Sequence, residues 1–538
     1  MYTNPFASHA YLVIDDFGDM RNMLKGIMRM LGATDIDSAS NGKDAIAAMQ
    51  RKKYDVVLCD YNLGVGKDGQ QVLEEARQRK LISMATVYFM VTAENTRSMV
   101  MGAMEYGPDG YLSKPFSKDL IKSRIEKVLS RKSELKEIYQ ALDAKRYDSA
   151  IELLDAKLKD QPKNSSELSR LKADVCLRAG RHDDAITIYE QALAVRDLPW
   201  ARLGLGKALF GKKQYGQAAE IFQQLNQSQP DLPVVLDWLA KCHQMLGDLE
   251  QAKADVQAAI ELSPKAILRQ QMLGDLGMQT RDYGLAGNAY KEMVKQGRNS
   301  VFNHPSLYAR LAKSQTQSDQ HDAALQSVSE MKKQFDGDSN VDFYAAVTEA
   351  QVYHNQGDAA ASAAAMHKAD ELYQTTGDKP DDDMTLELAK AASRLGDDEK
   401  ARALLKQVVQ NNHEDDGFLQ NVTAAMVEVG MNDDPQEFVS GLKKEIVEMN
   451  NRGVKLLQQG ELDDAMQLFE SAAEKMPGNR VLNLNAARVS VMLMEKNGAE
   501  PTRLERVDQY LHRLRQIDPD GQALPSLTAR LDKLAASI

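Results

Sequence analysis

The chain contains 538 residues and carries a formal net charge of −11 at pH 7. That length is sufficient for several domains and a large buried core. Lysines and arginines are interspersed with acidic residues, which argues against a nucleic-acid-binding protein, because phosphate neutralisation requires clustered cations. The three cysteines, Cys59, Cys176 and Cys242, are far apart and form no C-x-x-C pair. They indicate a reducing compartment, with neither structural disulfides nor a thiolate zinc site.

The N-terminal segment gives no targeting signal. Its first residues, M-Y-T-N-P-F-A-S-H, lack the charged and apolar regions of a signal peptide. No run of the sequence approaches the roughly 18 to 20 apolar residues of a membrane span. We therefore expect a soluble cytoplasmic protein that does not insert into a membrane.

Residues 1 to about 130 contain five short apolar segments that alternate with helical patterns. Alternation on this scale predicts an α/β domain with a doubly wound parallel sheet. The helix after the fourth segment is expected to begin at Glu94-Asn95. The five predicted strands are Tyr11–Asp16, Asp35–Ser40, Asp55–Asp60, Thr86–Ala93 and Gly110–Pro115.

Reactive side chains stand at the carboxyl ends of these segments, where open α/β sheets place their chemistry. They are Asp15 and Asp16 at the end of the first strand, Asp60 at the end of the third, Thr92 in the fourth and Lys114 near the end of the fifth. Three converging carboxylates would repel one another without a hard cation, and Mg²⁺ prefers such oxygen ligands. A lysine and a hydroxyl beside that ion make a cradle for a phosphoryl group. Asp60 is the natural nucleophile, because an aspartate can accept phosphorus as an acyl phosphate.

This set of residues resembles the site of a response-regulator receiver domain of the chemotaxis type, over residues 1–130. The resemblance implies a flavodoxin-like, five-stranded sheet with strand order 2-1-3-4-5. It also implies that Asp60 is the phosphoacceptor, loaded by a histidine kinase, a phosphotransfer protein or a small phosphodonor. Asp15, Asp16 and Asp60 would hold Mg²⁺ together with the main-chain carbonyl of Asn62.

The same resemblance assigns roles to the remaining side chains. Thr92 would bind a phosphoryl oxygen, and Lys114 would pair with the phosphoryl group. Tyr111 would be the aromatic switch residue that turns inward when Thr92 moves. The Lys114-Pro115 bond is similar to the family's cis peptide, and Glu94 occupies a position that tunes the lifetime of the phosphoryl group.

The loop after Asp60 departs from the receiver pattern. Gly64 stands where receivers usually carry a proline, and one extra residue precedes Asp68-Gly69. Because glycine widens the range of backbone conformations, we expect a mobile loop. Gly110 also replaces the acid usual just before the switch aromatic. A receiver that cannot be phosphorylated is the alternative, but such domains typically lose the aspartate or the lysine, and both are present here.

From about residue 131 the sequence shows no strand signals and repeats at intervals of 33 to 35 residues. An alanine marks each of the first units, and a large apolar residue usually follows four positions later. The pattern resembles the tetratricopeptide repeat, a hairpin of two helices in which small residues let the helices approach closely. Such hairpins must stack into a superhelix, because one alone cannot bury its apolar face. The marking alanines are Ala150, Ala185, Ala218, Ala252 and Ala286.

The two patterns divide the chain into three regions. We assign residues 1–130 to the receiver domain and residues 131–520 to an array of about ten repeat units, some of them degenerate. A degenerate unit is expected at Gly430 and a well-formed one at Gly460. Residues 521–538 are expected to form a C-terminal capping helix.

The junction between receiver and array contains no glycine or proline from Ser117 to Gln161. We therefore expect a rigid or directly continued helix there rather than a flexible linker. A stiff connection would let phosphorylation of Asp60 bias the first hairpins of the array.

Repeat arrays are binding surfaces, and the first helices of their hairpins line a concave groove. Large residues at such positions are candidates for contacts with a protein or peptide partner, since tryptophan and tyrosine are favoured at binding hot spots. The alternative is that these side chains are core residues between hairpins. The candidates are Trp200, Leu203, Phe210, Trp238 and Met245.

The leading hypothesis is a bacterial two-component signalling protein whose output is phosphorylation-modulated protein binding. The alternative is a constitutive scaffold in which the receiver acts mainly as a docking module. Beyond the receiver's own phosphorylation and dephosphorylation we expect no enzymatic activity, because the sequence contains no Gly-rich phosphate loop, H-E-x-x-H or G-x-S-x-G motif. A DNA-binding output is equally disfavoured, since the repeats leave no basic recognition helix.

Overall fold

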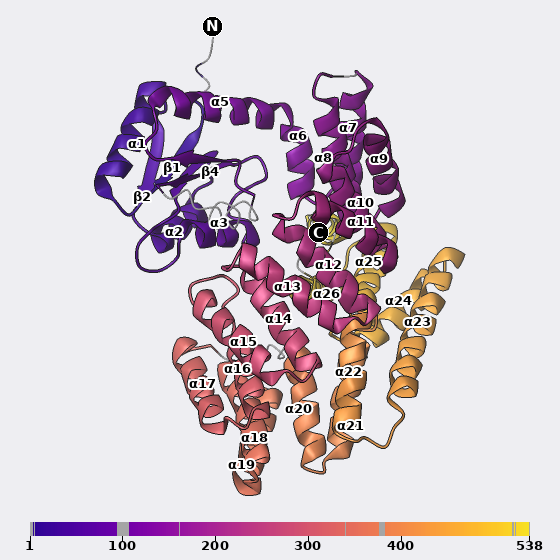
Figure 1. Ribbon diagram of the computed structural model, residues 1–538. Coiled ribbons are helices and arrows are strands. Elements are labelled where there is room, and N and C mark those ends of the chain that lie inside the picture. The colour runs from indigo at the N-terminus through magenta and orange to yellow at the C-terminus, as the bar shows by residue number, and fades with distance from the viewer. Residues whose placement is uncertain are drawn as a thin grey trace. The chain divides into compact units, whose positions relative to one another are not determined.

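The computed structural model describes residues 4, 6–93, 107–160, 162–338, 340–375, 382–518, 521 and 523–536. The chain divides into two compact units, 1–307 and 308–538. The first unit contains a β-sheet domain and helix pairs, and the second is helical throughout its described ranges (Figure 1). In the described parts of both units, no helix has the length and apolar character that crossing a membrane requires.

One sheet of five parallel strands forms the N-terminal domain. The strands are β1 (Ala10–Ile14), β2 (Asp35–Ala39), β3 (Val56–Asp60), β4 (Val87–Thr92) and β5 (Gly110–Ser113). Their order is β2-β1-β3-β4-β5, which confirms the predicted doubly wound sheet. Strands β3 and β4 are completely buried, as expected for central parallel strands covered on both faces.

Four described helices cover the sheet. They are α1 (Gly18–Leu31), α2 (Gly42–Arg51), α3 (Gly69–Gln78) and α5 (Lys118–Glu134). Helices α2 and α3 cover one face of the sheet, and α1 and α5 cover the other (Figure 1). Leu12 and Val57 lie in the core with α2 and α3, whereas the adjacent Val13 and Leu58 lie in the core with α1 and α5. Alternate residues thus enter opposite cores, as the two-residue period of a strand requires. The predicted helix that opens at Glu94 lies outside the described residues.

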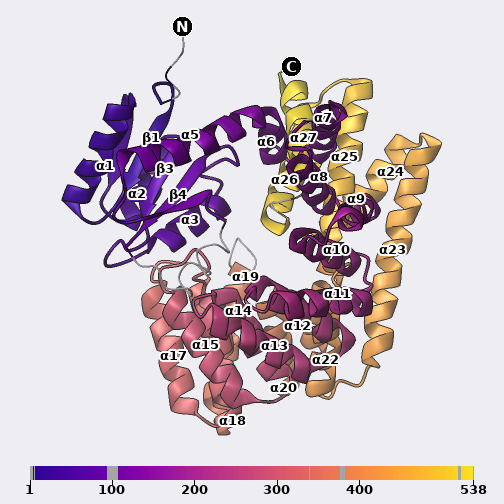
Figure 2. The ribbon, with the colours of Figure 1, turned by 45° about the horizontal axis from the view of Figure 1, so that its top comes forward.

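A single residue joins the last helix of the sheet domain to the first helix of the repeats. Helix α5 ends at Glu134 and α6 (Lys136–Asp143) begins after Leu135, whose φ of −105° and ψ of 11° interrupt the helix. The carboxylate of Asp143 accepts the N–H of Met84 at 3.1 Å, which ties α6 to the loop before β4. The predicted direct connection is present, but it is bent and the continuous helix does not form (Figure 2).

Helix pairs with the predicted period follow α6. In the first unit, a residue with a left-handed backbone separates the two helices of each described pair, five positions before the marking alanine. This regular turn confirms the repeated hairpin. In the first unit these residues are Lys145, Gly180, Lys213, Gly247 and Arg281, and in the second they include Asp319, Gly357, Gly396, Gly430 and Gly460.

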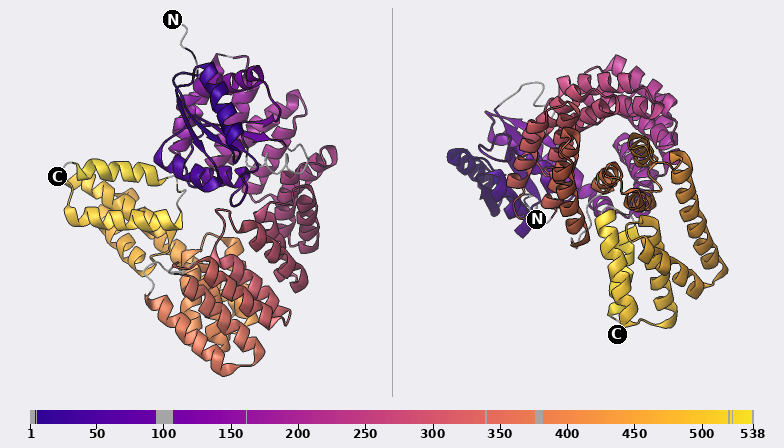
Figure 3. Two further views of the ribbon diagram at one scale, coloured as in Figure 1. Left: turned by 90° about the vertical axis from the view of Figure 1, so that its left-hand side faces the viewer. Right: turned by 90° about the horizontal axis from the view of Figure 1, so that it is seen from below.

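The helices of the repeats are 13 to 25 residues long from α7 onward. In the first unit they pack side by side in sequence order (Figure 3). They are α7 (Tyr147–Lys159), α8 (Ser165–Arg178), α9 (His182–Val195), α10 (Pro199–Gly211), α11 (Tyr215–Ser228), α12 (Pro233–Leu246), α13 (Leu249–Leu262), α14 (Ile267–Gln279) and α15 (Tyr283–Gly297).

The remaining helices belong to the second unit, apart from α16, which begins just before it. They are α16 (Pro305–Gln317), α17 (His321–Gln334), α18 (Val341–Gln356), α19 (Ala359–Thr375), α20 (Asp382–Arg394), α21 (Asp398–Asn411), α22 (Asp416–Glu428), α23 (Pro435–Gln459), α24 (Leu462–Lys475), α25 (Arg480–Asn497), α26 (Pro501–Ile517) and α27 (Ala523–Ala535). Helix α27 buries Leu524, Leu527 and Leu531 in a cluster with residues of α25 and α26. A helix is thus present where the sequence predicts a cap.

Small residues in the first helix of a hairpin make room for a large residue in the second. A Cβ atom added to Gly206 in α10 would lie 2.5 Å from the ring of Phe222 in α11. At Gly274 in α14 it would lie 2.3 Å from the ring of Tyr290 in α15. Each ring packs against the glycine of its own hairpin, which explains how the paired helices approach so closely.

Replacing Gly206 with alanine should destabilise the array. The new methyl group would overlap the fully buried ring of Phe222. Overpacking costs about 1 to 3 kcal/mol, which exceeds the ~1 kcal/mol that alanine gains over glycine within a helix. We expect a lower midpoint of thermal unfolding, measured by circular dichroism on the full chain. The matched control is Gly216→Ala in α11, where no atom lies within 4 Å of the added carbon, so that the midpoint should rise. A raised midpoint for Gly206→Ala as well would contradict the tight packing.

The second unit departs from the predicted repeat at α23, a single helix of 25 residues. The sequence predicts separate hairpins at Gly430 and Gly460, and both glycines do have a left-handed backbone. However, no turn separates the second helix of the first hairpin from the first helix of the next. Gly453 remains helical, and a Cβ there would lie 2.3 Å from the ring of Phe469. Two expected units therefore share one long helix, because no proline or left-handed glycine interrupts it.

Candidate functional site

The carboxyl ends of four parallel strands bring the predicted reactive side chains to one edge of the sheet. They are Asp15 and Asp16 after β1, Asp60 at the end of β3, Thr92 at the end of β4 and Lys114 after β5. The strand register aligns the carboxyl ends of these strands side by side. This edge is where open α/β sheets place their binding sites.

Lys114 connects two of the carboxylates. Its Nζ lies 2.9 Å from Oδ2 of Asp15 and 2.9 Å from Oδ2 of Asp60. Burial disfavours the ammonium, but the hydrogen bonds and charges of Asp60 and Asp15 keep the pKa of Lys114 above its ordinary value. Burial raises the pKa of Asp60, and the contact with Lys114 opposes that increase. The lysine therefore stays charged between two buried acids.

Two further groups hold Asp15 in position. The backbone N–H of Phe17 donates to Oδ1 of Asp15 at 2.8 Å. The guanidinium of Arg21 donates to the main-chain oxygen of Asp15 at 2.7 Å. The sequence did not predict Arg21 as part of the site, because nothing distinguishes one arginine from another in a helical segment.

The carboxylates of Asp15, Asp16 and Asp60 form a cluster of possible metal ligands. One oxygen from each lies within 4.8 Å of the others, with Asp16 on the exposed side. A set of carboxylate oxygens, with water molecules filling the remaining coordination positions, suits Mg²⁺ better than zinc or copper. The predicted ligand Asn62 lies in the exposed loop after β3, where its side-chain oxygen accepts the N–H of Gly64 at 3.2 Å.

Thr92 and Tyr111 lie on the last two strands. Thr92 is buried, and its main-chain oxygen accepts the N–H of Lys114 at 2.8 Å. The hydroxyl of Tyr111 is buried and has no hydrogen-bond partner among the residues that the structure describes. Burial raises the pKa of Tyr111 well above its ordinary value. The Lys114-Pro115 bond is cis, as the resemblance implied. The switch role of Tyr111 stays a prediction.

Helix α3 begins directly against the backbone of Asp60. Asp68 caps this helix, with its carboxylate accepting the N–H of Gln71. A Cβ atom on Gly69 would lie 2.1 Å from the main-chain oxygen of Asp60, so only glycine fits there. The N–H of Gly69 also donates to the main-chain oxygen of Tyr61 at 2.8 Å. A displacement of the Asp60 backbone would therefore be transmitted directly to the first residues of α3.

The predicted partner residues lie on α10 and α12 of the array. They are Trp200, Leu203 and Phe210 on α10, and Trp238 and Met245 on α12. The ring centroids of Phe210 and Trp238 are 5.2 Å apart, and both rings are partly buried against the core around α11 and α12. Trp200 instead contacts Tyr189, with ring centroids 6.0 Å apart. Met245 is 39% exposed. These side chains thus pack partly into the core and remain partly accessible to solvent.

Comparisons with protein families identify both regions. A family model described as a response regulator receiver domain matches residues 11–126. Models described as tetratricopeptide repeats match residues 141–203, 177–235, 235–265 and 385–412.

Individual relatives cover the two regions separately. The chemotaxis protein CheY of Pseudomonas aeruginosa is 33% identical over 120 residues, which are 22% of this chain and 95% of that protein. Chemotaxis protein CheY-3 of Vibrio cholerae is 31% identical over 22% of this chain and 91% of its own length. A solved tetratricopeptide repeat protein from Parabacteroides merdae is 14% identical, covers 47% of this chain and 95% of its own, and gives a TM-score of 0.32. Through its N-terminal domain, the chain belongs to the response regulator receiver family, and tetratricopeptide repeats follow that domain.

Proposed function

We propose that the chain is a two-component response regulator in which Asp60 accepts a phosphoryl group from a histidine kinase, a phosphotransfer protein or a small phosphodonor. The observation that carries this proposal is the bridge of Lys114 between Asp15 and Asp60, beside the exposed Asp16. An acyl phosphate at this edge would meet a lysine that can replace one carboxylate contact with a phosphoryl oxygen.

Asp60 acts as the nucleophile. One carboxylate oxygen of Asp60 bonds to phosphorus while the bond from phosphorus to the donor's leaving group breaks, and the leaving group keeps the electron pair. Lys114 then exchanges its contact with Asp60 for a phosphoryl oxygen, and the Thr92 hydroxyl donates to another. Attack of water on phosphorus later regenerates the carboxylate and releases inorganic phosphate.

Three carboxylates and one carbonyl would hold the metal. Asp15, Asp16 and Asp60, with the main-chain carbonyl of Asn62, would bind Mg²⁺, whose charge would offset that of the phosphoryl oxygens. Asp15 is already oriented for this role by the N–H of Phe17. The exposed Asp16 leaves the cluster open to solvent, from which the ion and the donor would enter.

We assign the receiver to residues 1–130, the repeat array to residues 131–520 and the cap to residues 521–538. In this proposal the array binds a protein or peptide partner. Trp238 supports this proposal. The ammonium groups of Lys241 and Lys207 lie 4.5 and 5.6 Å from the centre of its ring. An accessible aromatic flanked by two cations favours a partner with acidic groups.

Phosphorylation should change the affinity of that partner. A partner captured by the full chain would be titrated against wild type and Asp60→Asn, each with and without beryllofluoride and Mg²⁺. Allosteric couplings of ordinary size predict a change of about 5- to 150-fold in Kd for the wild type alone. Equal Kd values in all four conditions would favour the alternative, a constitutive scaffold whose receiver acts mainly as a docking module.

A further inference from the structure

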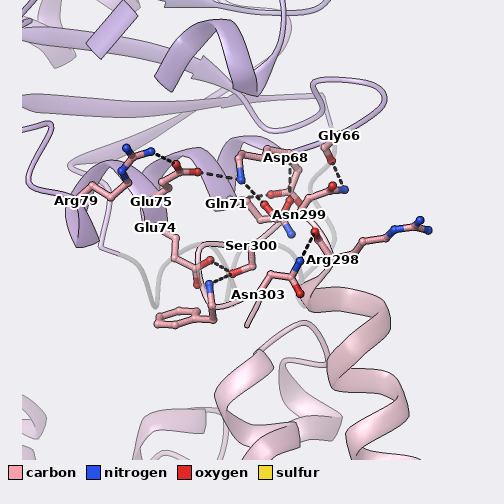
Figure 4. A network of polar contacts seen from close by, with 12 residues as sticks. Gly66, Asp68, Gln71, Glu74, Glu75, Arg79, Arg298, Asn299, Ser300 and Asn303 are labelled. Carbon is pink, nitrogen blue, oxygen red and sulfur yellow. Dashed lines mark hydrogen bonds and ion pairs between the residues drawn. The ribbon is translucent and has the colours of Figure 1, made fainter. Parts of the chain in front are cut away.

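The loop after the phosphoacceptor, residues 61–68, contacts a turn of the repeats within the first unit (Figure 4). The ammonium of Lys67 donates to the main-chain oxygen of Asn299 at 2.6 Å. In return, the side-chain amide of Asn299 donates to the main-chain oxygen of Gly66 at 3.0 Å. Asn299 lies in the turn between α15 and α16. The loop is therefore held at two adjacent residues by one residue of the array.

Helix α3 extends this contact. The hydroxyl of Ser300 donates to Oε2 of Glu74 at 2.7 Å, and both residues are buried (Figure 4). The amide of Gln71 donates to the main-chain oxygen of Gln296 at 3.3 Å. A buried carboxylate is costly to strip of a hydrogen bond. The contact therefore includes a buried carboxylate that is hydrogen-bonded across the interface.

Lys265 brings the array to the residue next to Asp60. It lies in the turn between α13 and α14. Its Nζ is 3.2 Å from the hydroxyl of Tyr61 and 5.1 Å from the centre of that ring. The same ammonium lies 3.9 Å from Oδ2 of Asp68, the cap of α3. The array thus contacts both ends of the 61–68 loop.

The contact uses the stretch in which the sequence departs from the receiver pattern. That stretch is longer by one residue and carries glycine in place of proline, and it supplies Gly66 and Lys67 to the interface. Gly64 and Gly66 have φ values of 72° and 111°, which side chains other than glycine rarely adopt. The interface therefore restrains a loop whose own sequence leaves it free to move.

We propose that docking of the repeat turns at Lys265 and at residues 296–300 onto loop 61–68 and α3 restrains Asp60, and that phosphorylation of Asp60 releases this docking. The inference rests on the proposed function and adds its regulation. The loop carries the proposed ligand Asn62, and a Cβ on Gly64 would lie 3.4 Å from Oδ2 of Asp16. A phosphoryl group and its cation must enter the site beside this loop. In this proposal the loop can rearrange only after its contacts with the array have broken.

Thermodynamic coupling makes this proposal reciprocal. If phosphorylation weakens docking by a given factor, then weakening of docking must favour phosphorylation by the same factor. Variants of the array that leave Asp60 and the other receiver residues unchanged should therefore alter the affinity of Asp60 for a phosphoryl mimic.

The test compares two double variants of the full chain. Lys265→Met with Asn299→Ala removes the contacts with Tyr61, Asp68 and Gly66. The matched control is Lys295→Met with Asn303→Ala, which makes the same chemical changes. Lys295 pairs with Glu292, and the Asn303 amide donates to the main-chain oxygen of Arg298, so both bonds stay within the array.

Two measurements are made on each chain. Without phosphodonor, the amides of α3 should exchange with solvent faster in the test variant than in wild type and control. With Mg²⁺, the test variant should bind beryllofluoride, an equilibrium mimic of the phosphoryl group, about tenfold more tightly, within the ordinary range of allosteric coupling.

Each contrary result has its own meaning. Unchanged exchange in α3 would overturn the docking itself. Faster exchange with an unchanged or weaker affinity for beryllofluoride would overturn the coupling while leaving the proposed function intact. A wild-type chain that takes up no phosphoryl group from acetyl phosphate and Mg²⁺ would remove the proposed function and this inference with it.

Discussion

The Asp60→Asn chain should take up no phosphoryl group from acetyl phosphate and Mg²⁺, whereas the wild type should form one acyl phosphate. The amide preserves the size of the side chain but removes the anionic oxygen that attacks phosphorus. Phosphate-affinity electrophoresis measures the uptake, and cleavage by hydroxylamine identifies the acyl phosphate. We expect the signal of the variant to fall to background.

The matched control for this variant is Asp37→Asn. Asp37 lies on β2, at the edge of the sheet, and its carboxylate pairs with Lys52 at 2.9 Å on the exposed surface. This variant should be labelled like the wild type, because it removes the same charge without touching the site. Label retained by Asp60→Asn would assign the nucleophile to a different side chain.

Burial also sets the protonation of Asp60 in the metal-free chain. Its pKa is raised above the ordinary aspartate value of about 3.9, so protonation begins at a higher pH than for an exposed aspartate. In the presence of a chelator, an NMR titration of the Asp60 carboxyl carbon should therefore give a midpoint above the ordinary aspartate range. A midpoint within that range would contradict this effect of burial.

The same shift fixes the sign of the effect on stability. A group whose pKa is raised in the folded state favours folding when protonated, and that contribution is lost as the pH rises through the raised pKa. At neutral pH the ionised Asp60 therefore weakens the fold. Asp60→Asn removes this charge and leaves Lys114 paired with Asp15. Its β3 amides should be at least as protected from hydrogen exchange as in the wild type, which separates lost labelling from lost structure.

The sheet and its reactive edge could be predicted because both depend on local patterns. Short apolar segments separated by helical patterns specify a parallel sheet, and in such a sheet the residues after each strand must meet at one edge. The sequence alone therefore predicts that Asp15, Asp60 and Lys114 lie together at that edge. The distances of 2.9 Å from Lys114 to both acids could not be predicted, since they depend on rotamers and on burial.

Long-range contacts account for what the sequence did not predict. Leu135 has no breaker residue beside it, and the bend there accompanies the bond from Met84 to Asp143. The contacts of Lys67 and Lys265 join segments about two hundred residues apart, and no local pattern marks either lysine. Only the unusual length and glycine content of the loop indicated that this stretch differs from other receivers.

Replacing Lys114 with methionine should strongly destabilise the receiver domain. Methionine keeps the length of the side chain but leaves the carboxylates of Asp15 and Asp60 without their shared cation. Removal of one partner from a buried ion pair costs about 3 to 5 kcal/mol. Because the Lys114 side chain is 16% exposed, we expect a loss of about 3 kcal/mol in the free energy of unfolding, at the lower end of that range. The quantity to measure is the free energy of opening at the β3 amides, from hydrogen exchange at neutral pH in the presence of a chelator.

The pH and Mg²⁺ dependence of this variant distinguish an electrostatic loss from a packing loss. Without Lys114 the pKa of Asp60 should rise further, so the destabilisation should be complete at neutral pH and should shrink as the pH falls and the carboxylate is protonated. A divalent cation can replace the missing charge, so Mg²⁺ should stabilise Lys114→Met more than the wild type by mass action. Lys118→Met, at an exposed position on α5, is the control and should stay within about 0.5 kcal/mol of the wild type. A deficit that neither acid nor Mg²⁺ reduces would mean that Lys114 stabilises the domain through its packing, and that the three carboxylates do not form the cation site from which the proposed chemistry starts.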